Sequence, residues 1–133
     1  MFSKFSPASG RVLRAAEQEC RNHNHYYVGA EHLLVALLEE NGAISERLRA
    51  EDIDAGEVHA EARRALGTGE DRLWEGILVT PRVRKIVALA QERAGDRLIE
   101  PLDLLDAIQS EGGSLAAEIL RRAKSRNTGA ALE

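Results

Sequence analysis

A motif that occurs twice constrains the fold of this chain more than any other feature of its sequence. Its first copy, residues 27–38, reads YVGAEHLLVALL: a glycine turn, an acid at a helix start and an almost wholly apolar helix. A weaker copy, residues 98–108, reads LIEPLDLLDAI, and the pair Leu33-Leu34 recurs in it 71 positions later. Self-similarity at a fixed interval is the signature of a repeated structural unit. The sequence therefore predicts a duplicated helical fold.

The first unit has the pattern of four helices. Ser6-Pro7 predicts a helix start, because serine caps helix N-termini and proline is tolerated at the first helical position. The apolar residues that follow recur every four positions, as on one face of a helix: Val12, Ala16 and Cys20. Leucines leave the second helix, about residues 31–40, little polar face, so we expect it at the centre of the core. A short helix through Ile44 and a helix closed by Gly67 complete the unit.

The second unit repeats this pattern but is incomplete. Thr80-Pro81 restarts it, and an apolar stripe follows. After Leu120 no amphipathic run corresponds to the fourth helix, which leaves three full helices and a frayed tail. We therefore predict an all-α, pseudo-twofold bundle built from a duplicated four-helix repeat, with seven to eight helices and the last helix shortened or absent. The predicted organisation is a single domain, 1–133, with repeat one at about 1–66, a connector at 67–79, repeat two at about 80–123 and a tail at 124–133.

Composition limits the classes of function. A chain of 133 residues has the size of one domain, and 44% apolar with 30% charged residues is typical of soluble globular proteins. No apolar run approaches the roughly 20 residues that span a bilayer. The net charge of -4 and an aromatic content of 4% argue against nucleic-acid binding. A single cysteine, Cys20, excludes an internal disulfide and fits a cytoplasmic location.

Three stretches carry a resemblance to a known family. Met1-Phe2, with Phe5-Ser6, opens the chain; residues 26–34 read YYVGAEHLL; and Thr80-Pro81-Arg82 opens the second unit. Over about residues 1–123 the chain resembles the duplicated amino-terminal domain of Clp-type AAA+ unfoldases, in particular the ClpC branch. The resemblance implies a non-catalytic module, monomeric in isolation, that captures substrate proteins or adaptors for a Clp ATPase and its protease.

The same resemblance implies particular site residues. In the ClpC branch the glutamate of each motif resembles a receptor for phosphorylated arginine; this carries over to Glu31 only, because Leu102 stands at the second position. A carboxylate in the first turn of a helix can accept a guanidinium, and the helix N–H groups can bind a phosphate. The alternative is that Glu31 only caps its helix. For adaptors and peptide-like ligands the resemblance implies a surface with Phe2, Val79 and Arg84.

One departure from the family concerns the start of the central helix. Ala30 stands where the family has a threonine, which we interpret as the helix N-cap. Loss of an N-cap hydroxyl costs about 1 kcal/mol. We therefore expect a weakened cap at this helix.

Other chemically suggestive residues favour structural roles. His23, His25 and His32 lie near Cys20 but lack zinc-binding spacings, so we expect no metal. Cys20 continues an apolar stripe, which is typical of a buried, inert thiol. Trp74 is interpreted either as a latch onto the domain or as a partner contact.

The sequence contains no enzyme signature. It has no G-x-x-x-x-G-K-[ST] motif, so we expect neither ATP hydrolysis nor another catalytic activity within it, and no cofactor. Two interpretations therefore remain open: a domain of a full unfoldase, or a stand-alone decoy or regulator without an ATPase ring.

Overall fold

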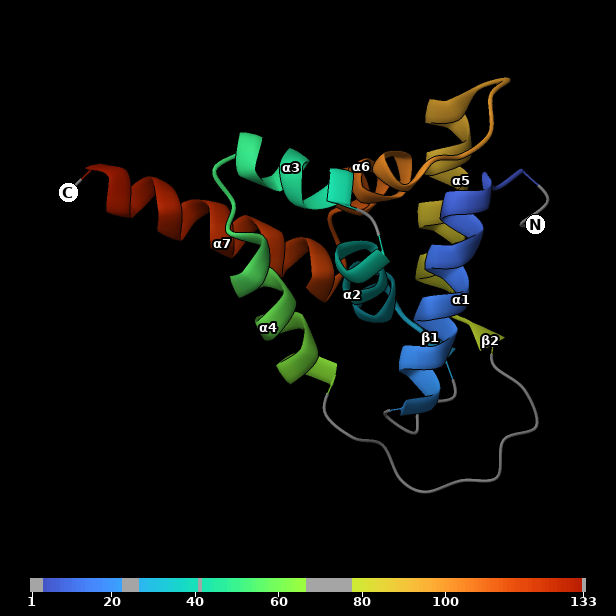
Figure 1. The fold of residues 1–133 in the computed structure, drawn as a ribbon, viewed down its shortest axis with the longest axis horizontal. Coiled ribbons are helices and arrows are strands. Elements are labelled where there is room, and N and C mark those ends of the chain that lie inside the picture. The colour runs from blue at the N-terminus through green and yellow to red at the C-terminus, as the bar shows by residue number, and fades with distance from the viewer. Residues whose placement is uncertain (1–3, 23–26, 41, 67–77, 133) are drawn as a thin grey trace.

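Seven helices and two short strands form the part of the chain that the computed structural model describes, residues 4–22, 27–40, 42–66 and 78–132 (Figure 1). In chain order they are α1 (Pro7–Asn22), β1 (Tyr27–Val28), α2 (Ala30–Glu40), α3 (Gly42–Ala50), α4 (Ala55–Leu66), β2 (Leu78–Val79), α5 (Pro81–Ala94), α6 (Pro101–Glu111) and α7 (Leu115–Leu132). The predicted all-α class is confirmed. Trp74 lies outside the described residues, as do His23 and His25.

Both predicted helix starts are formed by the expected side chains. The Ser6 hydroxyl accepts a hydrogen bond from the Ser9 N–H at 3.1 Å, at the start of α1. The Thr80 hydroxyl accepts one from the Val83 N–H at 3.2 Å, at the start of α5, and Pro81 follows it. Each hydroxyl satisfies an N–H group that has no partner within its own helix.

The repeated leucines form the core of the fold. Leu33, Leu34, Leu104 and Leu105 are all at most 1% exposed. Helix α2 packs against α1 on one side and α4 on the other, and it also contacts α7 (Figure 1). Surrounded in this way, α2 can bury nearly all of its faces, which explains why its sequence has almost no polar side.

Two short parallel pairings join the units reciprocally, and the sequence did not predict them. In the first, β1 pairs with β2, and the Thr80 N–H donates to the Val28 carbonyl at 3.2 Å. In the second, Ile99 donates to the Lys4 carbonyl at 2.8 Å and accepts from the Ser6 N–H at 3.0 Å. The segment ahead of α5 thus lies beside the one ahead of α2, and the segment ahead of α1 lies beside the one ahead of α6. This exchange is a pseudo-twofold arrangement.

The C-terminal part differs from the expected tail. Helix α7 continues to Leu132, so the backbone of residues 124–132 is helical rather than frayed. These residues contain no proline and several good helix formers, which allows a helix that has already started to extend. Among the described residues, no helix after α7 corresponds to α4. The boundaries of the two repeats are still a prediction.

An ion-pair cluster lies on α6, the central helix of the second unit. Among the described residues, this unit has no helix that corresponds to α4. At the position that corresponds to the fully buried Val35 of α2, α6 carries Asp106. Asp106 accepts hydrogen bonds from Arg47 of α3 at 2.7 Å and from Arg93 of α5 at 3.1 Å. An aspartate held by two arginines suits a partly exposed face, so α6 does not need an apolar helix to cover it.

No helix in the described residues has the length and apolarity to cross a membrane.

Candidate binding site at the start of helix α2

The start of α2 is capped differently from the sequence-based expectation. The Gly29 carbonyl accepts from the Leu33 N–H at 3.2 Å, so Gly29 is the N-cap and Ala30 is the first helical residue. His32, 5% exposed, accepts from the Gly29 N–H through Nδ1 at 2.9 Å. The interpretation of Ala30 as a weakened N-cap is therefore wrong, because a glycine and the His32 ring make the cap. His32 has the structural role that was expected of it.

The Glu31 carboxylate folds back over this cap. Glu31 is half-buried, and a Cβ atom added to Gly29 would lie 2.9 Å from Glu31 Oε2. Glycine at position 29 therefore leaves room for the carboxylate. Among the described residues, Glu31 has no hydrogen-bond or ion-pair partner for its side chain, and the N–H groups of Ala30 and Glu31 have no acceptor. The site offers one negative group and two hydrogen-bond donors side by side.

The equivalent position on α6 lacks the acid and one of the two N–H groups. Glu100 is the N-cap, Pro101 follows it and has no N–H, and Leu102 has no carboxylate. Asp103 corresponds to His32, and its carboxylate accepts from the Glu100 N–H at 2.9 Å. In both units, then, the third helical residue caps the N-terminus through its side chain. The residue before it is Glu31 in the first unit and Leu102 in the second.

At the start of α6, an arginine of the chain itself binds the capping aspartate. Arg97 donates to Asp103 Oδ2 at 2.5 Å and to Oδ1 at 2.7 Å, which is a bidentate contact. Hydrogen bonding from Arg97 lowers the pKa of Asp103; burial opposes this, and the Glu100 N–H supports it. Sequence analysis identified the loss of the acid at Leu102 but missed Arg97. No periodic signal marks an arginine in the turn before the helix as the partner of a residue inside it.

The other predicted binding residues lie in different places. Val79 belongs to β2 and pairs with Val28, directly before the start of α2. Arg84 is exposed on the first turn of α5, where its N–H donates to the Thr80 carbonyl at 3.1 Å. The β1–β2 pairing brings this region next to the Glu31 site. Phe2 lies outside the described residues. The first described residues, Lys4 and Phe5, directly precede the N-terminal end of α1, where Phe5 pairs with Ile99.

His59 and Cys20 also have structural environments. His59 of α4 contacts α2, because its Nε2 lies 2.7 Å from Glu39 Oε1. Cys20 is fully buried, and desolvation raises the pKa of its thiol to about 11, which leaves it protonated and unreactive at neutral pH. Among the described residues there is no cluster of metal-binding side chains.

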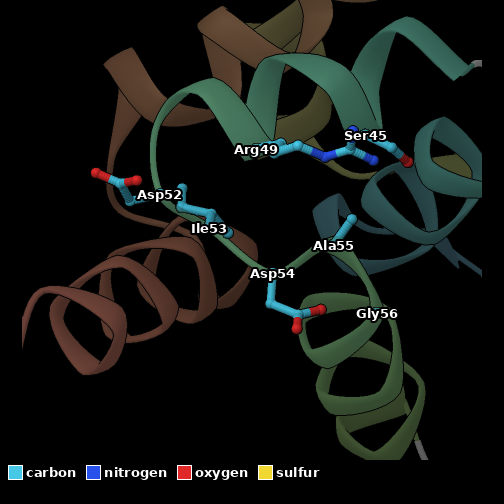
Figure 2. Close-up of a pocket in the computed structure, with 7 residues that line it drawn as sticks. All are labelled: Ser45, Arg49, Asp52, Ile53, Asp54, Ala55 and Gly56. Carbon is cyan, nitrogen blue, oxygen red and sulfur yellow. The ribbon is translucent and has the colours of Figure 1, made fainter. Parts of the chain in front are cut away.

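A hollow of about 480 Å³ lies between α3 and α4 (Figure 2). The Arg49 side chain runs along α3 toward Ser45, while Asp52 projects away from it. Asp54 is already engaged, because its carboxylate caps α4 by accepting from the Glu57 N–H at 3.1 Å. The hollow is open and polar, and its groups do not converge on one point, so we assign it no binding role.

Comparison with known proteins identifies the family of the chain. The family model described as "Clp repeat (R) N-terminal domain" matches residues 4–123. A chloroplastic chaperone protein ClpC of Pisum sativum is 30% identical over 124 residues, which cover 90% of this chain and 13% of the relative. The chaperone protein ClpB of Oceanobacillus iheyensis is 27% identical over 124 residues, 90% of this chain and 15% of the relative. The chain thus spans about one seventh of the length of these relatives.

Two solved structures share the fold. The N-terminal domain of ClpD from Arabidopsis thaliana superposes with a TM-score of 0.70 at 18% identity, covering 99% of this chain and 97% of that one. A chain from a malarial protein secretion system gives a TM-score of 0.75 at 17% identity, with 96% and 91% covered. The family model's match over residues 4–123, together with this fold, shows that the chain belongs to the Clp repeat N-terminal domain family.

Proposed function

We propose that this chain is a non-catalytic module that captures substrate proteins or adaptors for a Clp AAA+ unfoldase and its protease. Membership of the Clp N-terminal family supports this role, as do relatives that are named as Clp chaperones and ATP-binding subunits. The bundle presents helix starts and short strand edges on a rigid core, a suitable scaffold for a binding surface.

The observation that carries a finer assignment is the Glu31 carboxylate, which has no partner among the described residues and lies beside two N–H groups without an acceptor. A guanidinium can donate two parallel hydrogen bonds to a carboxylate. A phosphate attached to that guanidinium can accept from the N–H groups of Ala30 and Glu31, where the helix dipole also favours negative charge. Glu31 repels the phosphate, so its carboxylate must contact the far edge of the guanidinium. The ligand proposed for this site is phosphoarginine on a marked protein.

The second unit does not provide an equivalent site. Its helix start has one N–H group fewer because of Pro101, no acid at Leu102, and the Asp103 carboxylate bound to Arg97. A ligand arginine would have to displace a bidentate internal contact. The proposed stoichiometry is therefore one phosphoarginine per chain.

Val79 and Arg84 supply a second part of the proposed surface. Arg84 is exposed, and its side chain has no ion-pair partner among the described residues. The β1–β2 pairing brings the start of α5, which carries Arg84, near the start of α2. We include Val79 and Arg84, with Phe2 as suggested by family resemblance, in the adaptor- and peptide-binding surface.

Calorimetric titration of free phosphoarginine into the protein tests the site. The wild type should bind at one site per chain, and Glu31→Ala should weaken binding at least about tenfold, since a charge-assisted contact contributes roughly 1.5–3 kcal/mol. Glu46→Ala, on the exposed surface of α3, is the matched control and should bind like the wild type. No binding by the wild type, equal binding by Glu31→Ala, or two equivalent sites would each contradict the assignment.

A further inference from the structure

The outward face of α1 carries a row of arginines. Arg11, Arg14 and Arg21 are all exposed, and Gln18 lies among them. With 3.6 residues per turn, these four positions fall within an arc of about 80° around the helix. From Arg11 to Arg21 the row is about 15 Å long, at 1.5 Å per residue. These three arginines are called the α1 stripe below.

The arginines of the α1 stripe differ from most other arginines on the described surface because they have no ion-pair or hydrogen-bond partner. Arg47, Arg82 and Arg97 each contact a carboxylate of another segment. In the stripe, by contrast, all three guanidinium groups face solvent.

The acids of α1 do not neutralise the stripe. Glu19 is 3% exposed, points inward and pairs with Arg63 of α4. Glu17 is half-buried and makes no ion pair in the described part of the chain. The outward face of α1 therefore carries three arginines and only one acid, Glu17, which lies at its edge.

The stripe also contrasts with the charge of the whole chain, which is -4. Residues 39–61 hold eight acids and two basic residues, and they include α3 and the start of α4. In Figure 1, α1 lies on one side of the molecule and α3 on the other. The α1 stripe is therefore a local concentration of positive charge on a chain that is acidic overall. Such a field steers an oppositely charged partner toward one face.

We propose that the α1 stripe docks an acidic helical segment of a partner protein. Acid side chains spaced three, four and three residues apart on such a helix would match the spacing of the stripe. The short basic row, set in an acidic chain, favours a segment of about three turns over an extended polyanion such as nucleic acid, which the acids of α3 and α4 would repel. The inference rests on the proposed function only in taking the partner to be a protein, and it uses no residue of the Glu31 site.

The test measures binding of a fluorescent 16-residue helical peptide whose only charged side chains are glutamates at positions 3, 6, 10 and 13. The stripe variant is Arg11→Gln/Arg14→Gln/Arg21→Gln. The control variant, Arg49→Gln/Arg64→Gln/Lys124→Gln, changes the net charge equally at exposed positions elsewhere. Each exposed ion pair contributes a factor of roughly two to five, so the stripe variant should bind about tenfold more weakly or worse. The control should stay within about threefold of the wild type, and added salt should weaken wild-type binding.

Several results would overturn the proposal. If the stripe and control variants weaken equally, binding reflects net charge alone. If a single-stranded oligonucleotide of the same charge binds the stripe more tightly, the partner is not a protein. If sedimentation shows self-association that only the stripe variant abolishes, the stripe contacts a second copy of the chain. Glu31→Ala should leave peptide binding unchanged, so failure of the phosphoarginine titration and failure of the docking experiment are separate outcomes.

Discussion

The contact between Arg97 and Asp103 gives the sharpest test of how the second unit is built. Asp103 is 5% exposed and makes two hydrogen bonds with Arg97 and one with the Glu100 N–H. Asp103→Asn keeps the shape of the side chain but removes its charge. A hydrogen bond to a charged group contributes about 1.5–3 kcal/mol, discounted here because Arg97 is more than half exposed, and an acid near a helix N-terminus adds about 0.3–1 kcal/mol. We expect the free energy of unfolding to fall by roughly 1–2 kcal/mol at pH 7.

The pH dependence of this difference follows from the direction of the pKa shift. Arg97 holds the pKa of Asp103 in the folded protein below its ordinary value. The ionised carboxylate therefore stabilises the fold above about pH 4, and this stabilisation is lost as the pH falls through the lowered pKa. Urea unfolding followed by circular dichroism, at steps from pH 7 to pH 3, should show the difference between wild type and Asp103→Asn shrinking toward zero.

The control for this experiment is Asp96→Asn, an exposed aspartate in the turn before α6. It should change the free energy of unfolding by less than about 0.5 kcal/mol, as is usual for surface substitutions. The reasoning is refuted if Asp103→Asn is as mild as this control at pH 7, or if its effect is the same at pH 3 as at pH 7.

Three further substitutions or treatments test other parts of the fold. Leu34→Ala, at a fully buried position of α2, should lower the free energy of unfolding by about 2–5 kcal/mol, and a loss below 1 kcal/mol in urea titration would contradict its central place. Thr80→Ala should cost about 1 kcal/mol through loss of the cap on the Val83 N–H, and Thr80→Ser should restore most of it. Cys20 should not react with a thiol reagent at pH 8 until the protein is unfolded, since burial raises its pKa to about 11; rapid labelling of the folded protein would show that the thiol is accessible.

The helices were predictable because their signals are local. Ser6 and Thr80 each cap the helix that follows within three residues. The apolar stripes of α1 and α5 are spaced for one helix face, and their members are buried as expected. The repeated leucines marked the two central helices because only a surrounded helix can be apolar on nearly all sides.

The details of the helix starts were harder to predict. The sequence suggested Ala30 as the cap of α2, but the cap is Gly29 with the His32 ring, a pairing that depends on side-chain rotation. The acid at Glu31 and its loss at Leu102 were visible in the sequence. The folding of the Glu31 carboxylate over Gly29 required the structure.

By itself, the sequence determined the helical class, the duplication and the position of the single acid at Glu31, because periodicity, caps and repeated motifs act over a few residues. Only the tertiary structure decided which distant groups meet. It placed Arg97 on Asp103 and Arg47 on Asp106, and it paired the strands of one unit with those of the other. Such contacts are fixed by the packing of whole helices, which sets the relative positions of charges that no local pattern connects.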